Sequence, residues 1–153
     1  MRTLETWVEA PLKAFVAESQ ARVALLMTSS GQVVAQHGFT RSLDVMTAAA
    51  LGAGIIASTR ELAKETRAGS FGAVVHQGPR LGVYLVPFDM PATQWIGLVV
   101  FGADTSLGMV QLFFSRMIDD LIKSAPRQAA TREILPETFE EDLNSSLRAL
   151  FGR

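Results

Sequence analysis

The feature that most constrains this chain is a helix-forming stretch at positions 43–66 whose middle consists of small and apolar residues. Gly52 and Gly54 stand inside it, and each glycine costs about 1 kcal/mol relative to alanine, which favours close packing as their reason. The apolar residues follow helical spacing and spread around most of the circumference: Ala49, Ala50, Leu51, Ala53, Ile55, Ile56 and Ala57. Such a helix needs cover on two sides. One side can lie on a sheet, and the other can be covered by a second subunit, a partner or the terminal helices.

Hydrophobic periodicity and turn residues divide the rest of the chain into helices and strands. The predicted order is helix 4–19, strands 22–28 and 32–36, helix 43–66, strands 71–77, 81–88 and 94–101, and helix 107–124. Ser42 is expected to cap the long helix, and Asp104, Thr105 or Ser106 the last one. The expected inner face of the last helix is Leu107, Val110, Phe113 or Phe114, Met117, Leu121 and Ile122. This order, α-β-β-α-β-β-β-α, predicts an α+β fold with a five-stranded antiparallel sheet.

A tail follows the predicted domain, which Pro126 closes. Residues 127–136 have the composition of a linker, and Thr138 with Glu141 forms a capping box ahead of a short helix. The apolar side of that helix is Phe139, Leu143, Leu147 and Leu150. We therefore predict a domain at 1–126 and a linker with an amphipathic tail helix at 127–153.

The composition of the chain favours self-association and disfavours several other classes of partner. Hydrophobic residues make up 48% of the chain and charged residues 19%, against about 25% in typical domains, so apolar surface is expected to remain after folding and favours self-association. The 14 basic and 15 acidic residues nearly cancel, which disfavours nucleic acid as a partner. Without cysteine, a signal-peptide pattern or an apolar run of about 18 residues, the chain is expected to be cytoplasmic and to have no membrane span.

The sequence supplies few groups for catalysis. His37 and His76 are the only histidines; either could act as a base, but a polar residue at a strand end is the simpler interpretation. Asp119 and Asp120 are adjacent on a helix and point about 100° apart, so they cannot share a proton. Neither histidine has metal-ligand spacing, and the glycine pairs lack the pattern of a phosphate loop. We therefore expect no active site, no metal and no cofactor.

A resemblance to a known family rests on three segments. Residues 21–65, ARVALLMTSSGQVVAQHGFTRSLDVMTAAALGAGIIASTRELAKE, resemble the roadblock (dynein light-chain type) pattern of strand, glycine turn, strand and small-residue helix ending in a Leu-Ala pair. Residues 76–84 (HQGPRLGVY) and 101–110 (FGADTSLGMV) are similar to segments of the MglB-like bacterial members. The resemblance covers about residues 8–122 and implies a roadblock/longin-like three-layer fold.

The resemblance also implies a homodimer, with paired long helices and sheets joined edge to edge, that regulates a Ras-like small GTPase of the MglA type in polarity or motility. Members of this kind stimulate GTP hydrolysis by reshaping the GTPase's own active site, without an arginine finger. The expected dimer-interface residues are Ala49, Ala50, Gly52, Val74 and His76. The expected partner-binding residues are Ala53, Ile56, Ala57 and Arg60 at the exposed centre of the helix, and Phe139, Leu143, Leu147 and Leu150 in the tail.

One departure from the family pattern bears on that activity. Arg60 and Glu61 stand before Leu62 and Ala63, where the family's helix often continues with small residues. Larger charged side chains at this place can alter GTPase docking. The alternatives are a dimeric scaffold that joins signalling proteins without affecting nucleotide turnover and, in a third class, an unrecognised hydrolase.

Overall fold

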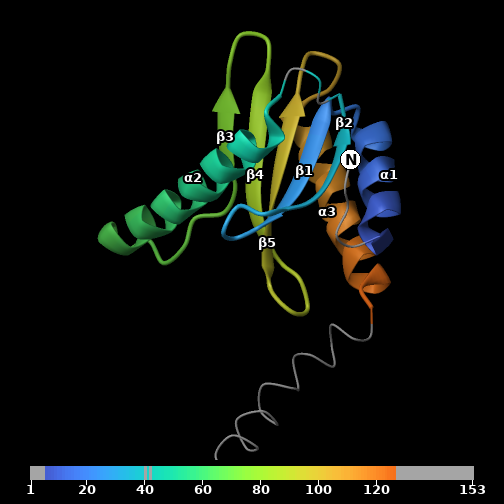
Figure 1. Ribbon diagram of the computed structural model, residues 1–153. Helices are drawn as coiled ribbons and strands as arrows, with labels where there is room; N and C mark the ends of the chain where they lie inside the picture. Colours follow the sequence, from blue (N-terminus) through green and yellow to red (C-terminus); the bar gives the residue numbers. More distant parts are fainter. Residues whose placement is uncertain (1–5, 40, 42, 127–153) are drawn as a thin grey trace, which may run out of the picture.

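One antiparallel sheet organises the domain, and its strand order is β2-β1-β5-β4-β3. The structure, a computed structural model, describes residues 6–39, 41 and 43–126. In chain order the elements are η1 (Thr6–Val8), α1 (Glu9–Ser19), β1 (Val23–Thr28), β2 (Val33–Gly38), α2 (Val45–Glu65), β3 (Val74–Gln77), β4 (Gly82–Asp89), β5 (Gln94–Phe101) and α3 (Leu107–Ser124) (Figure 1). This is the predicted order of helices and strands. The tail helix predicted within 127–153 lies outside the described residues.

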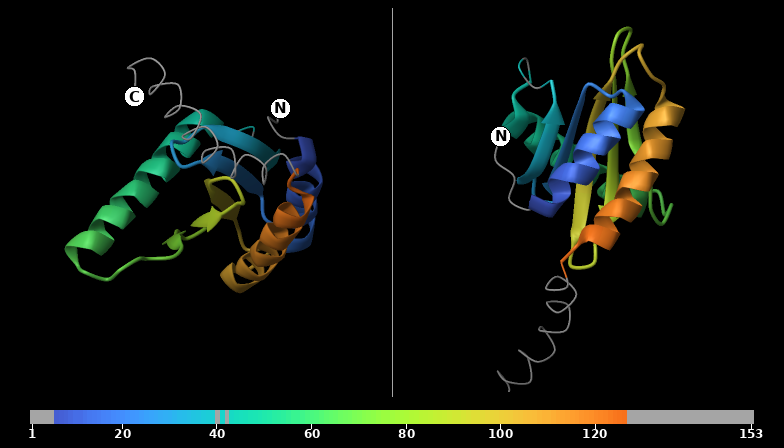
Figure 2. Two further views of the ribbon diagram at one scale, coloured as in Figure 1. Left: turned by 90° about the horizontal axis from the view of Figure 1, so that it is seen from below. Right: turned by 90° about the vertical axis from the view of Figure 1, so that its right-hand side faces the viewer.

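The elements form three layers (Figures 1 and 2). The helix α2 covers one face of the sheet and crosses its strands obliquely, whereas α1 and α3 lie side by side and antiparallel on the other face. On that face α1 packs over β1 and β2, and α3 packs over β4 and β5. The predicted three-layer α+β fold is confirmed.

Aromatic rings fill the space between the sheet and the pair formed by α1 and α3. The ring of Phe114 in α3 is 1% exposed and meets Phe15, Tyr84 and Phe88 edge to face, with centroid distances of 5.5 to 5.8 Å. Each such pair contributes about 0.5–1.5 kcal/mol beyond its buried area. Gly97 of β5 makes room for this ring, because a Cβ there would lie 2.2 Å from Cζ of Phe114. The cluster fixes α3 on the sheet.

The opposite face of the sheet carries an aliphatic core beneath α2. Its buried members are Val23, Leu25, Met27, Ala49, Ala53, Ile56, Leu85, Ile96 and Leu98. Because successive strand residues point to opposite faces, Leu25 lies in this core while its neighbours Ala24 and Leu26 lie in the core under α1 and α3. Burial on both faces explains why β1 is apolar without alternation.

Side-chain caps begin two of the helices. The N-cap of α2 is Asp44, whose Oδ1 accepts a hydrogen bond of 3.1 Å from the backbone N–H of Thr47. Hydrogen bonds from the backbone and side chain of Thr47 hold the pKa of Asp44 below its ordinary value. The prediction that Ser42 is the cap is wrong, because the backbone is still extended at Asp44; Ser42 itself lies outside the described residues. Ser106, one of the three predicted candidates, caps α3 through the N–H of Met109.

Two further expectations differ from the structure. The strand β3 begins at Val74 and not at position 71, because residues 66–73 form an exposed connection with left-handed backbone at Arg67 and Gly69. Ile122, predicted on the inner face of α3, is 44% exposed. It follows the fully buried Leu121 and therefore points about 100° away from it around the helix.

Candidate functional site

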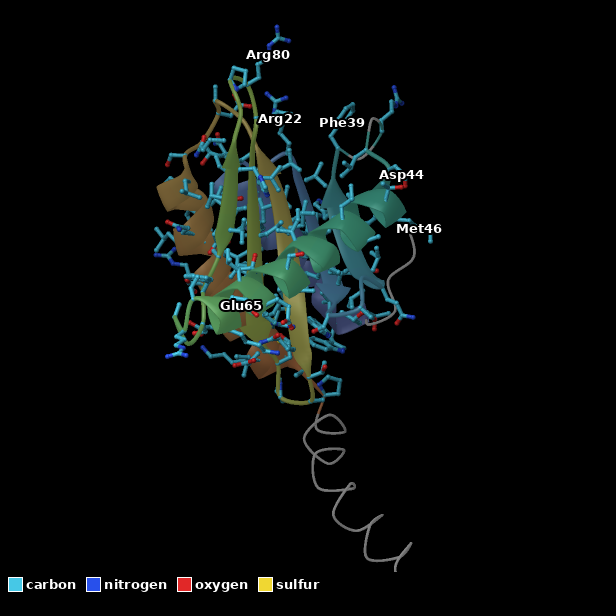
Figure 3. The ribbon with its side chains drawn as sticks, turned by 90° about the vertical axis from the view of Figure 1, so that its left-hand side faces the viewer. Arg22, Phe39, Asp44, Met46, Glu65 and Arg80 are labelled. Carbon is cyan, nitrogen blue, oxygen red and sulfur yellow. The ribbon has the colours of Figure 1, made fainter. Side chains whose placement is uncertain are left out.

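The outward face of α2 is an apolar helix surface that residues 6–39, 41 and 43–126 leave uncovered. Met46, Leu51 and Leu62 on this helix are 79%, 63% and 56% exposed. An open groove of about 470 Å³ follows the helix, and its lining includes Ala50, Leu51, Gly54, Ile55, Ser58 and Leu62. In Figure 3, α2 runs across the face of the sheet from Asp44 and Met46 to Glu65. Exposed apolar surface of this kind marks a place of association.

Two of the predicted partner contacts lie on the other side of α2. Ala53 and Ile56 are 8% and 2% exposed, and both pack in the core of their own sheet. The expectation that they lie on an exposed platform is therefore wrong. Two rows of residues on α2 have helical spacing, and the sequence alone does not distinguish the row that faces the sheet from the row that faces solvent. The exposed row, which the predicted site leaves out, contains Leu51, Ile55, Ser58 and Leu62.

The residues predicted for a dimer interface are divided between core and surface. Ala49 and Gly52 are buried on the side of α2 that faces its own sheet, which contradicts a place for them in a contact between subunits. Ala50 is exposed and lines the groove. Val74 and His76 belong to β3, which pairs with β4 on one side and forms an edge of the sheet. A free edge of this kind presents unpaired backbone groups to another strand.

The two glycines of α2 have different surroundings. A Cβ at Gly52 would lie 3.1 Å from Cδ2 of Leu85 and 3.3 Å from Cδ1 of Leu98. Glycine at this position lets the helix approach its own sheet closely. A Cβ at Gly54 would meet nothing within 4 Å. The predicted close approach therefore occurs at Gly52, within the chain, whereas Gly54 leaves the floor of the groove bare.

The remaining predicted contacts on α2, Ala57 and Arg60, are exposed. Arg60 is nevertheless held within the chain, because its Nη2 donates a hydrogen bond to Oε1 of Gln94 at the start of β5. Nε2 of Gln94 in turn donates a bond of 3.2 Å to Oδ1 of Asp89 at the end of β4. These bonds join α2 to the hairpin of β4 and β5. No sequence pattern indicates this contact, since Arg60 and Gln94 are 34 positions apart.

The neighbouring charges of α2 make one local ion pair. Nζ of Lys64 lies 3.2 Å from Oε1 of Glu61, and both side chains are more than two-thirds exposed. Pairs at such exposure contribute little to stability. The carboxylate of Glu61 therefore lies at the surface, one position after Arg60.

Groups that could carry chemistry are dispersed. His37 lies in β2 and His76 in β3, at opposite edges of the sheet. Asp119 and Asp120 are both exposed on α3. Within residues 6–39, 41 and 43–126, no three His, Asp or Glu side chains are grouped so that they could hold a metal ion. In the same part of the chain, no helix has the length and apolar character needed to cross a bilayer.

The predicted tail contacts, Phe139, Leu143, Leu147 and Leu150, lie outside the described residues. Their role stays a prediction from the sequence.

Comparison with known proteins places this arrangement in a family. Residues 8–90 match the Roadblock/LC7 domain. MglB of Myxococcus xanthus is 28% identical, with a TM-score of 0.69 over 78% of this chain and 95% of that chain. The gliding protein MglB of Thermus thermophilus is 31% identical, with a TM-score of 0.66 over 78% and 88%. A structure described as MglB with tetrameric arrangement is 28% identical, with a TM-score of 0.68 over 84% and 99%. No curated protein sequence matches the chain significantly.

These matches extend over most of the domain. The family match spans more than half of the chain, from the end of η1 to the residue after β4. The MglB structures are themselves covered over 88% to 99% of their lengths, so the similarity does not stop at a shared substructure. The predicted resemblance is confirmed, and this chain belongs to the Roadblock/LC7 family, within which it is similar to the MglB proteins.

Proposed function

We propose that this protein is a homodimeric regulator, of the GTPase-activating type, of a Ras-like small GTPase in bacterial polarity, motility or signalling. The observation that carries the proposal is the uncovered face of α2, where Leu51 and Leu62 border a groove floored by Gly54. A bare helix face of this kind allows another backbone or helix to approach closely. The similarity to MglB proteins supports a GTPase of the MglA type as the partner.

Self-association is the first part of the proposal. The groove along α2 and the free edge of β3 are two uncovered surfaces of one subunit, and a two-fold arrangement can cover both in the same contact. One similar MglB structure is described as tetrameric, which supports self-association in this family. Light scattering at micromolar concentration should give twice the chain mass of 16.6 kDa. A monomer at that concentration would argue against the whole proposal.

The second part is that the protein acts without an active site of its own. Arg60 is the one arginine within α2, and its guanidinium already bonds to Gln94. This supports activation by rearrangement of the GTPase's own catalytic residues over activation by an inserted arginine. The site of action is then the cytoplasm, where small GTPases work.

The decisive assay is single-turnover GTP hydrolysis by the MglA-type GTPase of the same organism. Wild-type protein should accelerate hydrolysis, and Ala57→Arg, on the exposed side of α2, should not. An unpaired charge buried in a contact costs several kcal/mol, enough to weaken binding at least about a hundredfold. Ala14→Arg, an equally large change at an exposed position of α1, is the matched control and should keep full activity. Equal rates with and without wild-type protein would reject the activator role.

A second candidate function is a dimeric scaffold that leaves nucleotide turnover unchanged. The observation that favours it is the exposed pair Arg60 and Glu61 on the proposed platform. A scaffold should bind the GTPase equally well with GDP and with GTP, whereas an activator should prefer the GTP form. Pull-down of the GTPase loaded with each nucleotide separates the two functions.

A further inference from the structure

One end of the sheet carries three arginines whose charges are not neutralised. Arg22 precedes β1, Arg41 lies between β2 and α2, and Arg80 lies in the turn between β3 and β4; all three are exposed. In the described part of the chain their guanidinium groups have no hydrogen-bond or ion-pair partner. Figure 3 shows Arg80, Arg22 and Phe39 at this same end. Arg22 and Phe39 are joined through the backbone, because the N–H of Phe39 donates a hydrogen bond to the carbonyl oxygen of Arg22.

A pocket of about 290 Å³ lies between the β3–β4 turn and the loop from β5 to α3. Arg80, Leu81, Gly102 and Ser106 are among its lining residues, and Arg22 packs on Gly102, where a Cβ would lie 2.8 Å from the guanidinium. Phe39 and Leu81 add side chains that are 64% and 42% exposed. This end of the domain therefore offers a partly apolar pocket with Arg80 and Arg22 beside it, and Arg41 farther along the same end, after the edge strand β2. We call it the arginine end, after Arg22, Arg41 and Arg80.

The carboxylates of this region do not neutralise it. Asp104 lies in the loop from β5 to α3 and is exposed. Asp44 caps α2 through the N–H of Thr47 and keeps its negative charge. Three arginines against these two aspartates still leave a positive surplus. A ligand of the arginine end should accordingly be acidic and carry an apolar or aromatic group.

The chain itself contains such a segment. Five of its 15 acidic residues lie within positions 133–142, and no basic residue interrupts them. Phe139 stands in the middle of this run, next to Glu140 and Glu141. Charge and side-chain type both match the arginine end.

We infer that the acidic segment 133–142 docks on the arginine end of its own chain, with Phe139 at the pocket and its carboxylates against Arg41 and Arg80. This goes beyond the proposed function and does not depend on it. The linker is long enough for such a return. The helix α3 ends at the opposite end of the sheet from the β3–β4 turn (Figure 1), and its 18 residues span about 27 Å. The ten residues 127–136 can span about 33 Å when extended.

Because the segment is tethered to the domain, even a weak contact is enough to populate the docked form. A short linker holds the segment at an effective concentration in the millimolar range, so the docked form is populated even when the free segment would bind weakly. The arginines of the proposed arginine–carboxylate pairs are exposed. Since the Debye length is about 8–10 Å at physiological salt, the attraction in such pairs is sensitive to ionic strength. Docking should therefore weaken as salt is raised.

The absence of cysteine allows a direct test on the full-length chain. Ala103→Cys, on the exposed wall of the pocket, is combined with Thr138→Cys in the tail, and disulfide formation is followed on non-reducing gels. The matched control pairs Thr138→Cys with Ala14→Cys, an exposed position halfway along α1. We call these two variants the Ala103 pair and the Ala14 pair. If the segment docks, the disulfide of the Ala103 pair should form within one chain about tenfold faster than that of the Ala14 pair at low salt. Equal rates for the two pairs, or crosslinks that join two chains, would overturn the inference.

Charge reversal tests the electrostatic part. Arg41→Glu with Arg80→Glu should slow closure of the Ala103 pair several-fold, and Glu140→Lys with Glu141→Lys in the same protein should restore it. Lys13→Glu with Arg67→Glu makes the same change in net charge at exposed positions elsewhere and should have no effect. The inference would also be overturned if charge reversal at the arginine end did not change the rate of disulfide formation. It would likewise be overturned if Lys13→Glu with Arg67→Glu slowed disulfide formation equally.

Discussion

Gly97 of β5 lies directly beneath the ring of Phe114 of α3, so close that a Cβ at position 97 would lie 2.2 Å from Cζ of the ring. This contact determines how closely α3 can approach the sheet. Phe114 also joins Phe15, Tyr84 and Phe88 in one aromatic cluster. A displacement of this ring would therefore disturb α1, α3 and β4 together.

Gly97→Ala is expected to destabilise the domain by about 1–3 kcal/mol, because the added methyl group overpacks a core that has no free space at this point. Urea unfolding followed by circular dichroism measures the change. Gly108→Ala is the matched control, since a Cβ there would meet only Oγ of Ser106 at 4.0 Å and alanine favours the helix. An equal effect of the two substitutions would contradict the packing argument.

Ile56→Ala should lower the free energy of unfolding by about 2–4 kcal/mol, because Ile56 is 2% exposed and its loss leaves a cavity between α2 and the sheet. The same substitution at the 44% exposed Ile122 should cost less than about 1 kcal/mol. Thermal and urea unfolding of both variants provide the comparison. A small effect of Ile56→Ala would contradict the burial of Ile56 and favour the exposed position that was predicted for it from the sequence.

The cap of α2 should make stability depend on pH. The pKa of Asp44 is lowered in the folded state by hydrogen bonds from Thr47, so its carboxylate stabilises the fold above the ordinary pKa, and this contribution is lost as the pH falls through the lower, folded pKa. Asp44→Asn keeps an acceptor for the N–H of Thr47 but has no charge to titrate. The stability difference between wild type and Asp44→Asn should be largest near pH 7 and shrink below pH of about 4. A difference that does not change with pH would show that the charge contributes nothing.

The bonds from Arg60 to Gln94 and from Gln94 to Asp89 should couple α2 to the β4–β5 hairpin. A double-mutant cycle with Arg60→Ala and Gln94→Ala should give a coupling free energy of about 0.5–1 kcal/mol, since Arg60 is exposed and Gln94 is only partly buried. Hydrogen exchange in the hairpin should quicken in Arg60→Ala. Additive effects of the two substitutions would mean that the hydrogen bond contributes nothing measurable.

Sequence reasoning predicts the order of elements because each strand is bounded by turn residues and each helix has a distinct apolar period. It places β5 and α3 at their observed limits, where Gln94 and Ser106 mark clear beginnings. It fails at the start of β3, because residues 71–73 are apolar or small but do not pair with β4. The residue pattern of one strand does not show how many of its residues will pair with the neighbouring strand.

The candidate site is harder to predict for a related reason. The helix α2 is apolar on two sides, and helical spacing alone does not separate Ile56 from Leu51. The side that faces the sheet is decided by contacts with residues distant in sequence, such as Leu85 and Leu98 against Gly52. The bond from Arg60 to Gln94 is of the same kind. Both depend on tertiary geometry, which the period of a single segment does not contain.

The position of β5 in the middle of the sheet has a consequence for biosynthesis. Val100 pairs with Val23 on one side and with Val83 on the other, so the last strand to be made is the one that joins the two hairpins. While the ribosome still holds β5, β1 with β2 and β3 with β4 can form only separate pairs, each with an open inner edge. The sheet can close only after residue 101 has emerged, which makes the late stage of synthesis the interval in which unpaired strands are exposed to aggregation and to chaperones.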